Sequence, residues 1–280
     1  MIALIDSGST KADWRIFDRA GLIVSCQTVG MNPYFVSSTE VLNIINQCIP
    51  VIQKAQNIHE VYFYGAGCGS VDKRNMILTA LKQIFPNSIV SVDSDMVGAA
   101  KALFGNKTGI AAILGTGANS CLWDGNQIVQ NAPSLGYIIG DEGSGAHLGL
   151  SLIRKYLHNQ LPQDIKTELE NKYPVSRDII LENVYKKPNP NRYLAQFTYF
   201  IKESIDHQFM KFIVTGCFLE FMEKYIKYYN GYNKYEIGCI GSVAYAFKEI
   251  FNECAIASEC DVVKIISSPI DELIQIYSKE

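Results

Sequence analysis

The chain opens with the sequence IALIDSGSTKADWRIF at residues 2–17, and this stretch decides the fold. Residues 2–5 are a short apolar run, which predicts a strand that leads directly into a turn at Asp6–Lys11. Apolar and polar side chains alternate again over residues 12–17, which predicts a second strand, and residues 22–28 predict a third. The chain therefore begins with three consecutive strands, and the turn between the first two is rich in Gly and Ser.

The same pattern begins again at Gly109. Residues 110–114 predict an apolar strand, and Gly115–Asn119 form a second Gly-rich turn. Two further strands are predicted at residues 120–123 and 127–130, with a hairpin turn between them. The second segment is therefore a copy of the first in the order of its strands and turns.

This internal repeat is the most informative feature of the organisation of the chain. Gly8 and Gly115 lie 107 positions apart and occupy equivalent places in the two copies. Two copies imply two related lobes, for which we expect the boundaries 1–107 and 108–280. Each lobe would present its Gly-rich turn to a shared cleft.

The remaining segments have helical or strand spacing and predict an α/β protein. Helices are predicted at residues 38–55, 71–85, 94–104, 243–251 and 270–277, and strands at 61–64, 89–92, 235–240 and 261–266. Residues 148–229 are dominated by helical spacing, with a break rich in Pro and Asn at 187–191, and predict a helical insertion in the second lobe. We expect the last helix to return to the N-terminal lobe.

The composition indicates a globular protein. Of the 280 residues, 48% are hydrophobic and 19% are charged, which is not the composition of a disordered chain. The net charge of −3 argues against nucleic acid as a partner, because phosphate neutralisation needs a concentrated basic surface. No apolar run approaches the ~18 residues that span a membrane, and the N-terminus does not resemble a signal peptide. We therefore expect a cytoplasmic protein without a membrane partner.

The cysteines predict neither disulfides nor a metal site. The chain has 8 Cys residues, but no Cys-x-x-Cys pair and no His at ligand spacing. Most of them stand among apolar residues, where Cys packs like a small hydrophobic side chain. We therefore predict buried free thiols.

The first Gly-rich turn has the residue types of a phosphate-binding turn. A Gly between two strands lets backbone N–H groups approach phosphate oxygens. Asp6, at the end of the preceding strand, can hold Mg²⁺ through water. The candidate phosphate contacts are Ser7, Gly8, Ser9, Thr10 and Lys11. Taken alone, the segment is better explained as an ordinary hairpin turn, since it matches neither a Walker A loop nor Gly-x-Gly-x-x-Gly.

Two later segments strengthen the case for a nucleotide. Gly115 and Gly117 flank Thr116 directly after a buried strand, an arrangement that would clamp a phosphate from the opposite side. Gly241 and Ser242 end a strand and open a helix of small residues, so a flat ring such as adenosine can lie against the backbone. A strand–Gly–helix junction is common in α/β proteins, but two equivalently placed Gly-rich turns favour a phosphate site over two structural turns.

In this order, the three segments resemble the phosphate-1, phosphate-2 and adenosine motifs of the acetate and sugar kinase/actin/heat-shock chaperone superfamily. Residues 30–33, 93–100 and 140–146 narrow the match. In these three segments the chain is similar to the N-acetylglucosamine kinase branch of the BadF/BadG/BcrA/BcrD ATPase family. The resemblance implies two ribonuclease H-like lobes of the actin-like ATPase fold with a nucleotide cleft between them. It also implies ATP and Mg²⁺ as cofactors, an amino sugar as substrate and a homodimer.

The resemblance further implies a role for individual residues. Asp95 matches the catalytic base that accepts a proton from the sugar hydroxyl as it attacks the γ-phosphoryl group. Asp93 is a competitor, and only the family register selects Asp95, which also fits a plain helix-start charge. The positions expected to hydrogen-bond sugar hydroxyls or the acetamido group are matched by Asn32, Thr116, Asn119 and Asp141.

The chain departs from the family pattern in its first turn. The usual sequence there is Asp-Gly-Gly-Gly-Thr-Lys, and Ser7 and Ser9 replace two of its glycines. Serine requires ordinary φ/ψ at both sites, so the approach of the turn to a phosphate is altered.

The leading hypothesis is a kinase that transfers phosphate from ATP to a hydroxyl of N-acetylglucosamine, the 6-hydroxyl. Glucosamine and N-acetylmuramic acid are close alternatives as substrates. A second class is an ATPase activator of a dehydratase, which would need cysteines to share an iron–sulfur cluster. A third is a sugar-binding regulator without catalysis.

Overall fold

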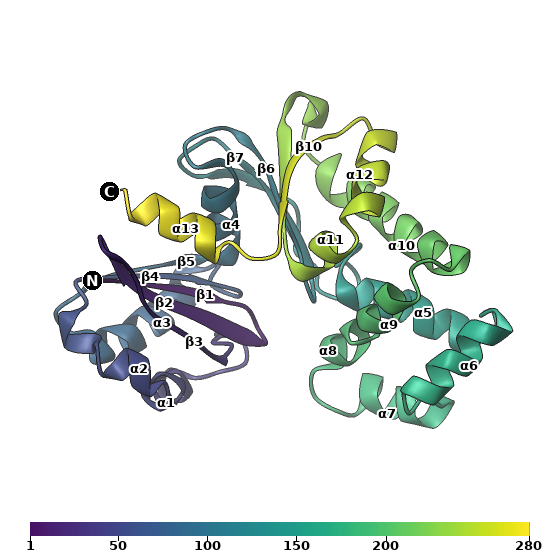
Figure 1. Ribbon diagram of the computed structural model, residues 1–280, viewed down its shortest axis with the longest axis horizontal. Coiled ribbons are helices and arrows are strands. Elements are labelled where there is room, and N and C mark those ends of the chain that lie inside the picture. The colour runs from purple at the N-terminus through teal and green to yellow at the C-terminus, as the bar shows by residue number, and fades with distance from the viewer. Residues whose placement is uncertain (280) are drawn as a thin grey trace. The chain divides into compact units, whose positions relative to one another are not determined.

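The computed structural model describes residues 1–279 and divides into two compact units (Figure 1). The first unit contains Met1–Lys107, Gly125–Gln127 and the segment from Ser268 onward. The second contains Thr108–Asp124 and Ile128–Ser267. Each unit has one five-stranded sheet, in the orders β3-β2-β1-β4-β5 and β8-β7-β6-β9-β10. The two orders are equivalent, so the repeat predicted from the sequence is confirmed as two ribonuclease H-like lobes of the actin-like ATPase fold.

The first sheet joins an antiparallel hairpin series to two parallel strands. Its strands are β1 (Ile2–Ser7), β2 (Lys11–Asp18), β3 (Gly21–Val29), β4 (Glu60–Gly65) and β5 (Ile89–Ser94). β1 pairs antiparallel with β2 and parallel with β4. The helices of this unit are α1 (Ser38–Gln47), α2 (Ile49–Ile52), α3 (Val71–Ile84), α4 (Asp95–Phe104) and α13 (Ile270–Tyr277), with a 3₁₀ turn at Ala55–Asn57.

One face of the first sheet carries the main core of the unit. Trp14 and Phe63 from the sheet are buried against Val41 of α1 and Leu81 of α3. The opposite face meets α4 and α13, which lie side by side in Figure 1. On α13, the ring of Tyr277 stacks on that of Tyr62 with 4.0 Å between centroids.

The helix predicted over residues 38–55 is broken into three pieces. α1 starts with a capping box, in which the Ser37 hydroxyl accepts from the Glu40 N–H and the Glu40 carboxylate accepts from the Ser37 N–H. It ends at Gln47, because Pro50 has no N–H to bond the carbonyl of residue 46. The periodicity of the apolar residues continues past this point, which is why the sequence pattern alone predicted one long helix.

The second sheet repeats the arrangement of the first. Its strands are β6 (Gly109–Leu114), β7 (Ala118–Trp123), β8 (Ile128–Asn131), β9 (Glu236–Ile240) and β10 (Asp261–Ile266). The helical insertion comprises α5 (Gly145–Leu157), α6 (Gln163–Lys172), α7 (Arg177–Tyr185), α8 (Pro190–Ala195), α9 (Phe197–Glu203) and α10 (Gln208–Phe221), followed by a π-helical turn (Met222–Ile226) and a 3₁₀ turn (Tyr232–Lys234). The helix predicted at 243–251 is divided into α11 (Ser242–Ala246) and α12 (Lys248–Ala257).

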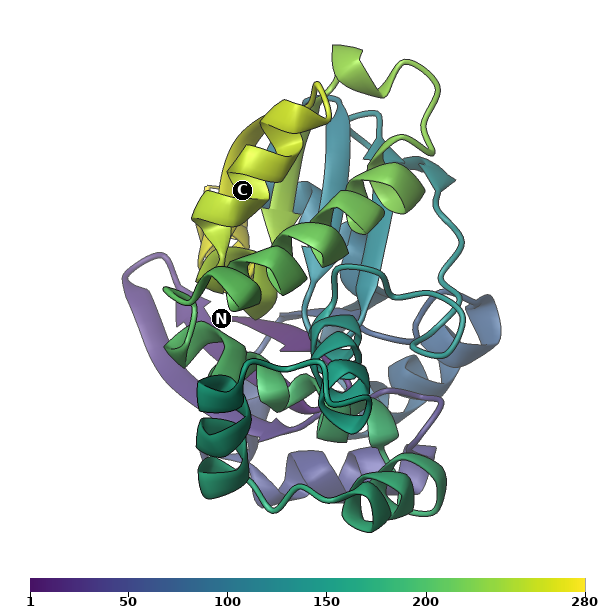
Figure 2. The same cartoon turned by 90° about the vertical axis from the view of Figure 1, so that its right-hand side faces the viewer.

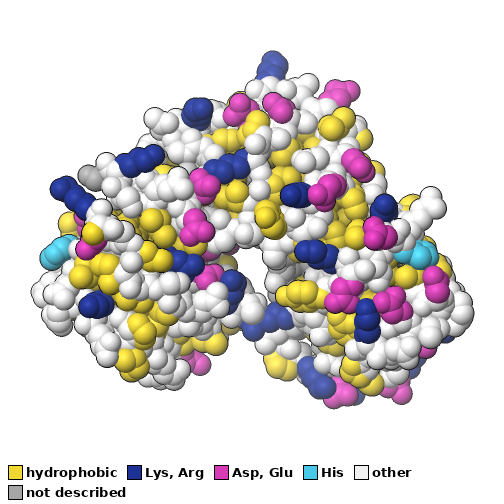
Figure 3. Space-filling view, in the orientation of Figure 1, with side chains coloured by type: hydrophobic (Ala, Val, Ile, Leu, Met, Phe, Trp, Pro, Cys, Tyr) yellow, Lys and Arg dark blue, Asp and Glu magenta, His cyan; other side chains and the backbone are white. Residues whose placement is uncertain are grey.

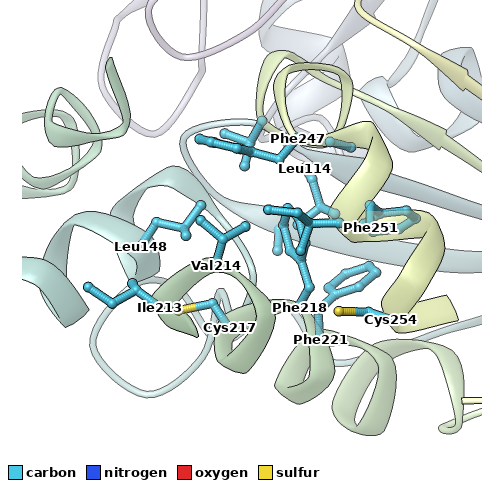
Figure 4. Close-up of a cluster of buried hydrophobic side chains, with 14 of the residues drawn as sticks. Leu114, Leu148, Ile213, Val214, Cys217, Phe218, Phe221, Phe247, Phe251 and Cys254 are labelled. Atoms are coloured by element: carbon cyan, nitrogen blue, oxygen red, sulfur yellow. The ribbon is translucent and has the colours of Figure 1, made fainter. Parts of the chain in front are cut away.

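An aromatic core holds the helices of the second unit to the end of β6. Helix α10 crosses one face of the second sheet (Figure 2, green) and places Phe218 next to Phe251 of α12, with ring centroids 5.3 Å apart. Figure 4 shows Leu114, the last residue of β6, among the side chains of this cluster. Each fully buried Phe or Leu side chain stabilises the fold by about 1.5–3 kcal/mol. The turn that follows Leu114 therefore starts from a rigid support.

The surface carries charges of both signs. On the face that Figure 3 shows, Lys and Arg side chains are interspersed with Asp and Glu side chains. This distribution is in keeping with 25 Lys and Arg against 28 Asp and Glu residues in the sequence. No helix formed by residues 1–279 combines the length and the apolar character needed to cross a membrane.

Candidate active site

The first Gly-rich turn follows β1 and is supported by the segment after β3. The Ser7 side chain is fully buried, and its hydroxyl accepts a hydrogen bond from the Met31 N–H at 2.9 Å. Gly8 is exposed, and neither Ser7 nor Ser9 has the positive φ that favours glycine. Serine is thus compatible with the backbone of this turn. The structure directs the Ser7 hydroxyl to the protein interior, whereas residues 8–10 form the outer part of the turn.

Asn32 lies against the same turn. Its Nδ2 donates to the Ser9 hydroxyl at 2.7 Å, and its Oδ1 accepts from the Tyr34 N–H at 3.0 Å. The side chain is buried, so these bonds fix its orientation. The structure therefore places a predicted sugar contact and a predicted phosphate contact in direct hydrogen-bonded contact within the first unit.

The carboxylates of the first unit gather near the end of β1. Asp6 pairs in register with Asp13 of β2 and with Tyr64 of β4, and Tyr64 pairs with Asp93 of β5. Paired residues on neighbouring strands lie on the same face of a sheet, so Asp6 and Asp93 flank Tyr64. Asp95 is the first residue of α4, and its Oδ1 accepts from the Met96 N–H at 2.9 Å.

The electrostatics of this group distinguish Asp95 from Asp93. Burial raises the pKa of Asp6 to about 7, and the negative charges of Asp95 and Asp13 contribute in the same direction. Burial also raises the pKa of Asp95, although hydrogen bonds from the N–H groups of Met96 and of Asp95 itself oppose the shift. Asp95 therefore interacts with Asp6, while the charge of Asp93 acts on Tyr64.

The donor set around Asp6 is suited to a hard divalent cation. Among residues 1–279, no group of three or more His, Cys, Asp or Glu side chains is placed to hold a metal ion by itself. Mg²⁺ is commonly bound through one or two carboxylates, several waters and the phosphates of a nucleotide, so a single carboxylate such as Asp6 is sufficient. A bound cation would also relieve the repulsion among Asp6, Asp13 and Asp95. Lys11 does so only in part, since its ammonium lies 3.0 Å from Asp13 and is 62% exposed.

We expect an Asp6→Asn variant of the metal-free protein to gain stability over the wild type as the pH rises. Because the folded-state pKa of Asp6 is raised to about 7, above its ordinary value of 3.8, the folded protein binds the extra proton between these values. Wild-type stability therefore falls as the pH rises from about 4 through about 7 and then levels off, whereas the amide does not titrate. Urea unfolding of both proteins between pH 5.5 and 8 in EDTA measures the difference. A difference that does not change with pH would contradict this assignment.

The second Gly-rich turn is attached to the N-terminus of α5. The Gly145 N–H donates to the Gly115 carbonyl at 2.8 Å, and the Ala146 N–H donates to the Thr116 carbonyl at 3.1 Å. In a trans peptide, the carbonyl of one residue and the N–H of the next point in opposite directions. The N–H groups of Thr116 and Gly117 therefore point away from α5. Successive N–H groups oriented in this way form an anion-binding concavity.

Asp141 completes the second turn. Its backbone is left-handed, with φ 59°, and its buried side chain accepts from the Ala118 N–H at 3.1 Å. Burial raises its pKa. A Cβ at Gly117 would lie 3.0 Å from the Asp141 carboxylate, so the turn packs closely against this side chain. The structure thus brings Asp141 to the turn that contains Thr116, although 25 positions separate the two residues in the sequence.

Asn119 stands on β7, immediately after this turn. Its Oδ1 accepts from the Ser120 N–H at 2.9 Å and from the Asn131 amide at 3.1 Å. Its side chain is partly buried. The amide of Asn119 is therefore oriented by β8 as well as by its own strand.

Tyr225 positions Asp141 and was not predicted from the sequence. The Tyr225 hydroxyl accepts from the Asp141 N–H at 3.0 Å, and Tyr225 lies in the π-helical turn after α10. Such π-bulges are frequent at functional sites, but the sequence around residue 225 reads as ordinary helix. No sequence signal links two residues 84 positions apart.

A Tyr225→Phe variant should lower the free energy of unfolding by about 1–3 kcal/mol, because it leaves the buried Asp141 N–H without its acceptor. We also expect kcat/KM for the substrate to fall roughly tenfold, because Asp141 loses its fixed position. Tyr228→Phe, at a side chain that is 43% exposed, is the matched control. Equal effects of the two substitutions would show that Tyr225 has no positioning role.

Gly241 brings the third sequence segment to the second turn. It has φ 129°, and a Cβ there would lie 2.1 Å from the Leu114 carbonyl oxygen. Its N–H donates to the Ile266 carbonyl at 2.9 Å. The junction between β9 and α11 therefore touches the end of β6, directly before Gly115.

The cysteines are all free, and every one except Cys26 is buried. Burial raises the pKa of the thiols that show a shift, for example to about 11 at Cys217 and at Cys254. A raised pKa leaves a thiol protonated at neutral pH, and the protonated form is a poor metal ligand. The buried cysteines therefore have the environment of side chains that pack in the core.

Comparison with solved structures identifies proteins of the same fold. A protein from Porphyromonas gingivalis assigned as an N-acetylglucosamine kinase is 38% identical and superposes with a TM-score of 0.95, over 100% of this chain and 99% of that one. A second protein with the same assignment, from Chromobacterium violaceum, is 13% identical, with a TM-score of 0.71 over 98% of each chain. A ROK family glucokinase from Streptomyces griseus, in complex with glucose and AMPPNP, is 13% identical, with a TM-score of 0.56 over 96% of this chain and 95% of that one.

The last two proteins share the fold alone at these identities. No protein-family model matches the sequence, and neither does any curated protein. The Porphyromonas gingivalis protein matches the present chain from end to end.

Proposed function

The chain belongs to the N-acetylglucosamine kinase branch of the BadF/BadG/BcrA/BcrD ATPase family, and on this premise we propose that it phosphorylates an amino sugar with ATP. The acceptor is N-acetylglucosamine or a close relative, and the acceptor atom is its 6-hydroxyl oxygen. The observation that carries the proposal is the position of Asp95. This carboxylate stands at the start of α4, near enough to Asp6 to raise its pKa.

In this proposal Asp95 is the general base. A buried carboxylate with a raised pKa is a stronger proton acceptor than an exposed one, and a base with a pKa closer to neutrality is more effective. Asp95 takes the proton of the sugar hydroxyl as its oxygen attacks the γ-phosphorus atom of ATP. The bond from that phosphorus to the bridging oxygen breaks, and ADP leaves. The hydrogen bond from the Met96 N–H holds the carboxylate in position.

The nucleotide is bound by backbone groups more than by side chains. We assign the phosphates to the outer part of the first turn, Gly8–Thr10, and to the N–H groups of Thr116 and Gly117. Gly241 and Ser242 are assigned to the adenosine. Lys11 adds positive charge near the first turn. Mg²⁺, held by Asp6 through water, would neutralise the charge that develops on the phosphates.

The sugar is bound by groups that already have partners in the protein. Asn32 and Asp141 are buried and oriented by hydrogen bonds, and an amide or carboxylate can form further bonds beyond the ones observed. Thr116 in the second turn adds a hydroxyl, and Asn119 at the start of β7 adds an amide. Preoriented polar groups discriminate strongly, because an analogue that lacks the matching hydroxyl or acetamido group leaves them unpaired.

A panel of ATP-coupled assays tests the function. N-acetylglucosamine, glucosamine, N-acetylmuramic acid and glucose are compared by kcat/KM in the presence of Mg²⁺. We expect an amino sugar to be preferred over glucose by at least about tenfold, which corresponds to 1.4 kcal/mol of discrimination. Sugar-independent ATP hydrolysis by an iron-containing, coloured preparation would instead support the dehydratase activator. Sugar binding without phosphorylation would support a regulator.

A further inference from the structure

The first phosphate turn and the loop that carries Asn32 are joined by two serine hydroxyls. These hydroxyls belong to Ser7 and Ser9, the positions at which the chain departs from the glycines of the family pattern. Glycine has no side chain and could not form either bond. The departure therefore adds a connection inside the first unit.

The bond from Ser7 is structural. Its hydroxyl is fully buried, accepts from the Met31 N–H at 2.9 Å and donates to the Gly8 carbonyl at 3.4 Å. Nearby, the backbones of the turn and the loop are in contact, since a Cβ at Gly30 would lie 2.1 Å from the Gly8 carbonyl oxygen. The Gly30 N–H also donates to the Thr10 carbonyl at 3.1 Å. Loop and turn are therefore one rigid piece at this end.

The bond from Ser9 reaches a side chain that we assign to the sugar. The Ser9 hydroxyl accepts from Asn32 Nδ2 at 2.7 Å. Ser9 itself stands in the outer part of the turn, which we assign to the phosphates. A hydroxyl that accepts a hydrogen bond from an amide is a better donor to a third group, because hydrogen bonds in a chain polarise one another. Ser9 thus connects the assigned phosphate site with the assigned sugar site.

The far side of the loop is anchored as well, so movement of the turn reaches Asn32. Asn32 Oδ1 accepts from the Tyr34 N–H at 3.0 Å. The Lys73 ammonium, on α3, donates to the Pro33 carbonyl at 2.9 Å and lies 4.6 Å from the centroid of the Tyr34 ring. A Cβ at Gly67 would lie 2.3 Å from Asn32 Oδ1, so the space around the amide is closed. The Asn32 amide is therefore held in a fixed position relative to the Ser9 hydroxyl, and a displacement of the turn displaces the amide with it.

We propose that the Ser9 hydroxyl couples amino-sugar binding to ATP binding by holding the Asn32 amide in a fixed position relative to the first phosphate turn. This inference rests on the function proposed above. Each ligand then favours the arrangement of Ser9 and Asn32 that the other one needs. Coupling between two bound ligands is reciprocal, so each must tighten the other by the same factor. Ser9 is a positioning residue for the sugar in this scheme as well as a phosphate contact.

Calorimetric titration of the full-length protein measures the coupling. The dissociation constant of N-acetylglucosamine is determined without nucleotide and with saturating AMPPNP and Mg²⁺, and the ratio of the two is the coupling factor. We expect a factor of at least about 5 for the wild type, the lower end of typical couplings. In Ser9→Ala the factor should fall close to 1 at saturating AMPPNP, because the ratio depends on the contact between residue 9 and Asn32 and is separate from any loss of affinity for AMPPNP alone. The KM for the sugar should rise roughly tenfold. This change corresponds to about 1.4 kcal/mol, the contribution of one hydrogen bond between uncharged groups.

Two further variants separate coupling from packing. Ser9→Thr keeps the hydroxyl and should retain the coupling factor. Thr79→Ala, on the outer side of α3, removes a hydroxyl of the same kind away from the site and should also retain it. An unchanged coupling factor in Ser9→Ala would overturn the inference while leaving the kinase function intact. If the wild type phosphorylates no amino sugar, the proposed function fails and the inference fails with it.

Discussion

An Asp95→Asn variant is expected to fold normally and to lose about 10²- to 10⁴-fold in kcat for sugar phosphorylation. The amide has the shape of the carboxylate and keeps an oxygen that accepts from the Met96 N–H, a bond of 2.9 Å in the wild type. It cannot take the proton of the attacking hydroxyl. Replacing a buried charge next to Asp6 also removes a repulsion, so the free energy of unfolding should stay the same or increase.

Asp93→Asn is the matched control for this prediction. Asp93 lies two residues earlier, on the same sheet face as Asp6, but its charge acts on Tyr64. Its replacement should change kcat by less than about tenfold, since it is not the group that accepts the proton. Steady-state kinetics at saturating ATP and sugar measure both variants. A larger loss of kcat in Asp93→Asn than in Asp95→Asn would transfer the role of the base to Asp93.

A Gly241→Ala variant is expected to lose about 2–5 kcal/mol of stability, together with most of its affinity for ATP. Two costs add at this position. The backbone has φ 129°, which an L-residue rarely adopts, and the new Cβ would lie 2.1 Å from the Leu114 carbonyl oxygen. That oxygen is backbone and belongs to the end of β6, so it cannot move without displacing the second turn.

Gly136→Ala separates the two costs. Gly136 also has a positive φ, of 74°, but a Cβ there would meet no atom within 4 Å. It should therefore show only the strain of about 1 kcal/mol and an unchanged affinity for ATP. Urea unfolding and nucleotide titration measure both variants. If Gly241→Ala were no less stable than Gly136→Ala, the close packing of Gly241 on β6 would be refuted.

The succession of strands along the chain was predictable because it depends on local patterns. Alternation and Gly-rich turns repeat at residues 2–28 and 109–130, and each of these segments forms three consecutive strands. The ends of the helices were less predictable, because the spacing of apolar residues continues unchanged past a single residue that breaks the helix. Pro50 ends α1 early, and Phe247, with φ −119°, divides α11 from α12.

The candidate site was predictable only in part. Gly-rich turns can be recognised in the sequence from their residue types, as in the segments around Gly8 and Gly115. The partners that orient them are distant in sequence. Ser7 bonds to Met31, and the left-handed Asp141 bonds to Tyr225, and neither contact leaves a pattern in the residues alone. Such pairings depend on the tertiary structure and have to be read from it.

The fate of the γ-phosphorus atom of ATP tests most directly whether the protein is an amino-sugar kinase. Wild-type protein is incubated with ATP, Mg²⁺ and N-acetylglucosamine, and the products are followed by ³¹P nuclear magnetic resonance. We expect the γ signal to be replaced by one phosphomonoester signal, coupled to the protons on C6 of the sugar, with ADP formed in equal amount. Asp95→Asn should form this product at least about 10²-fold more slowly. Phosphate that appears only as the free inorganic ion would contradict a sugar kinase.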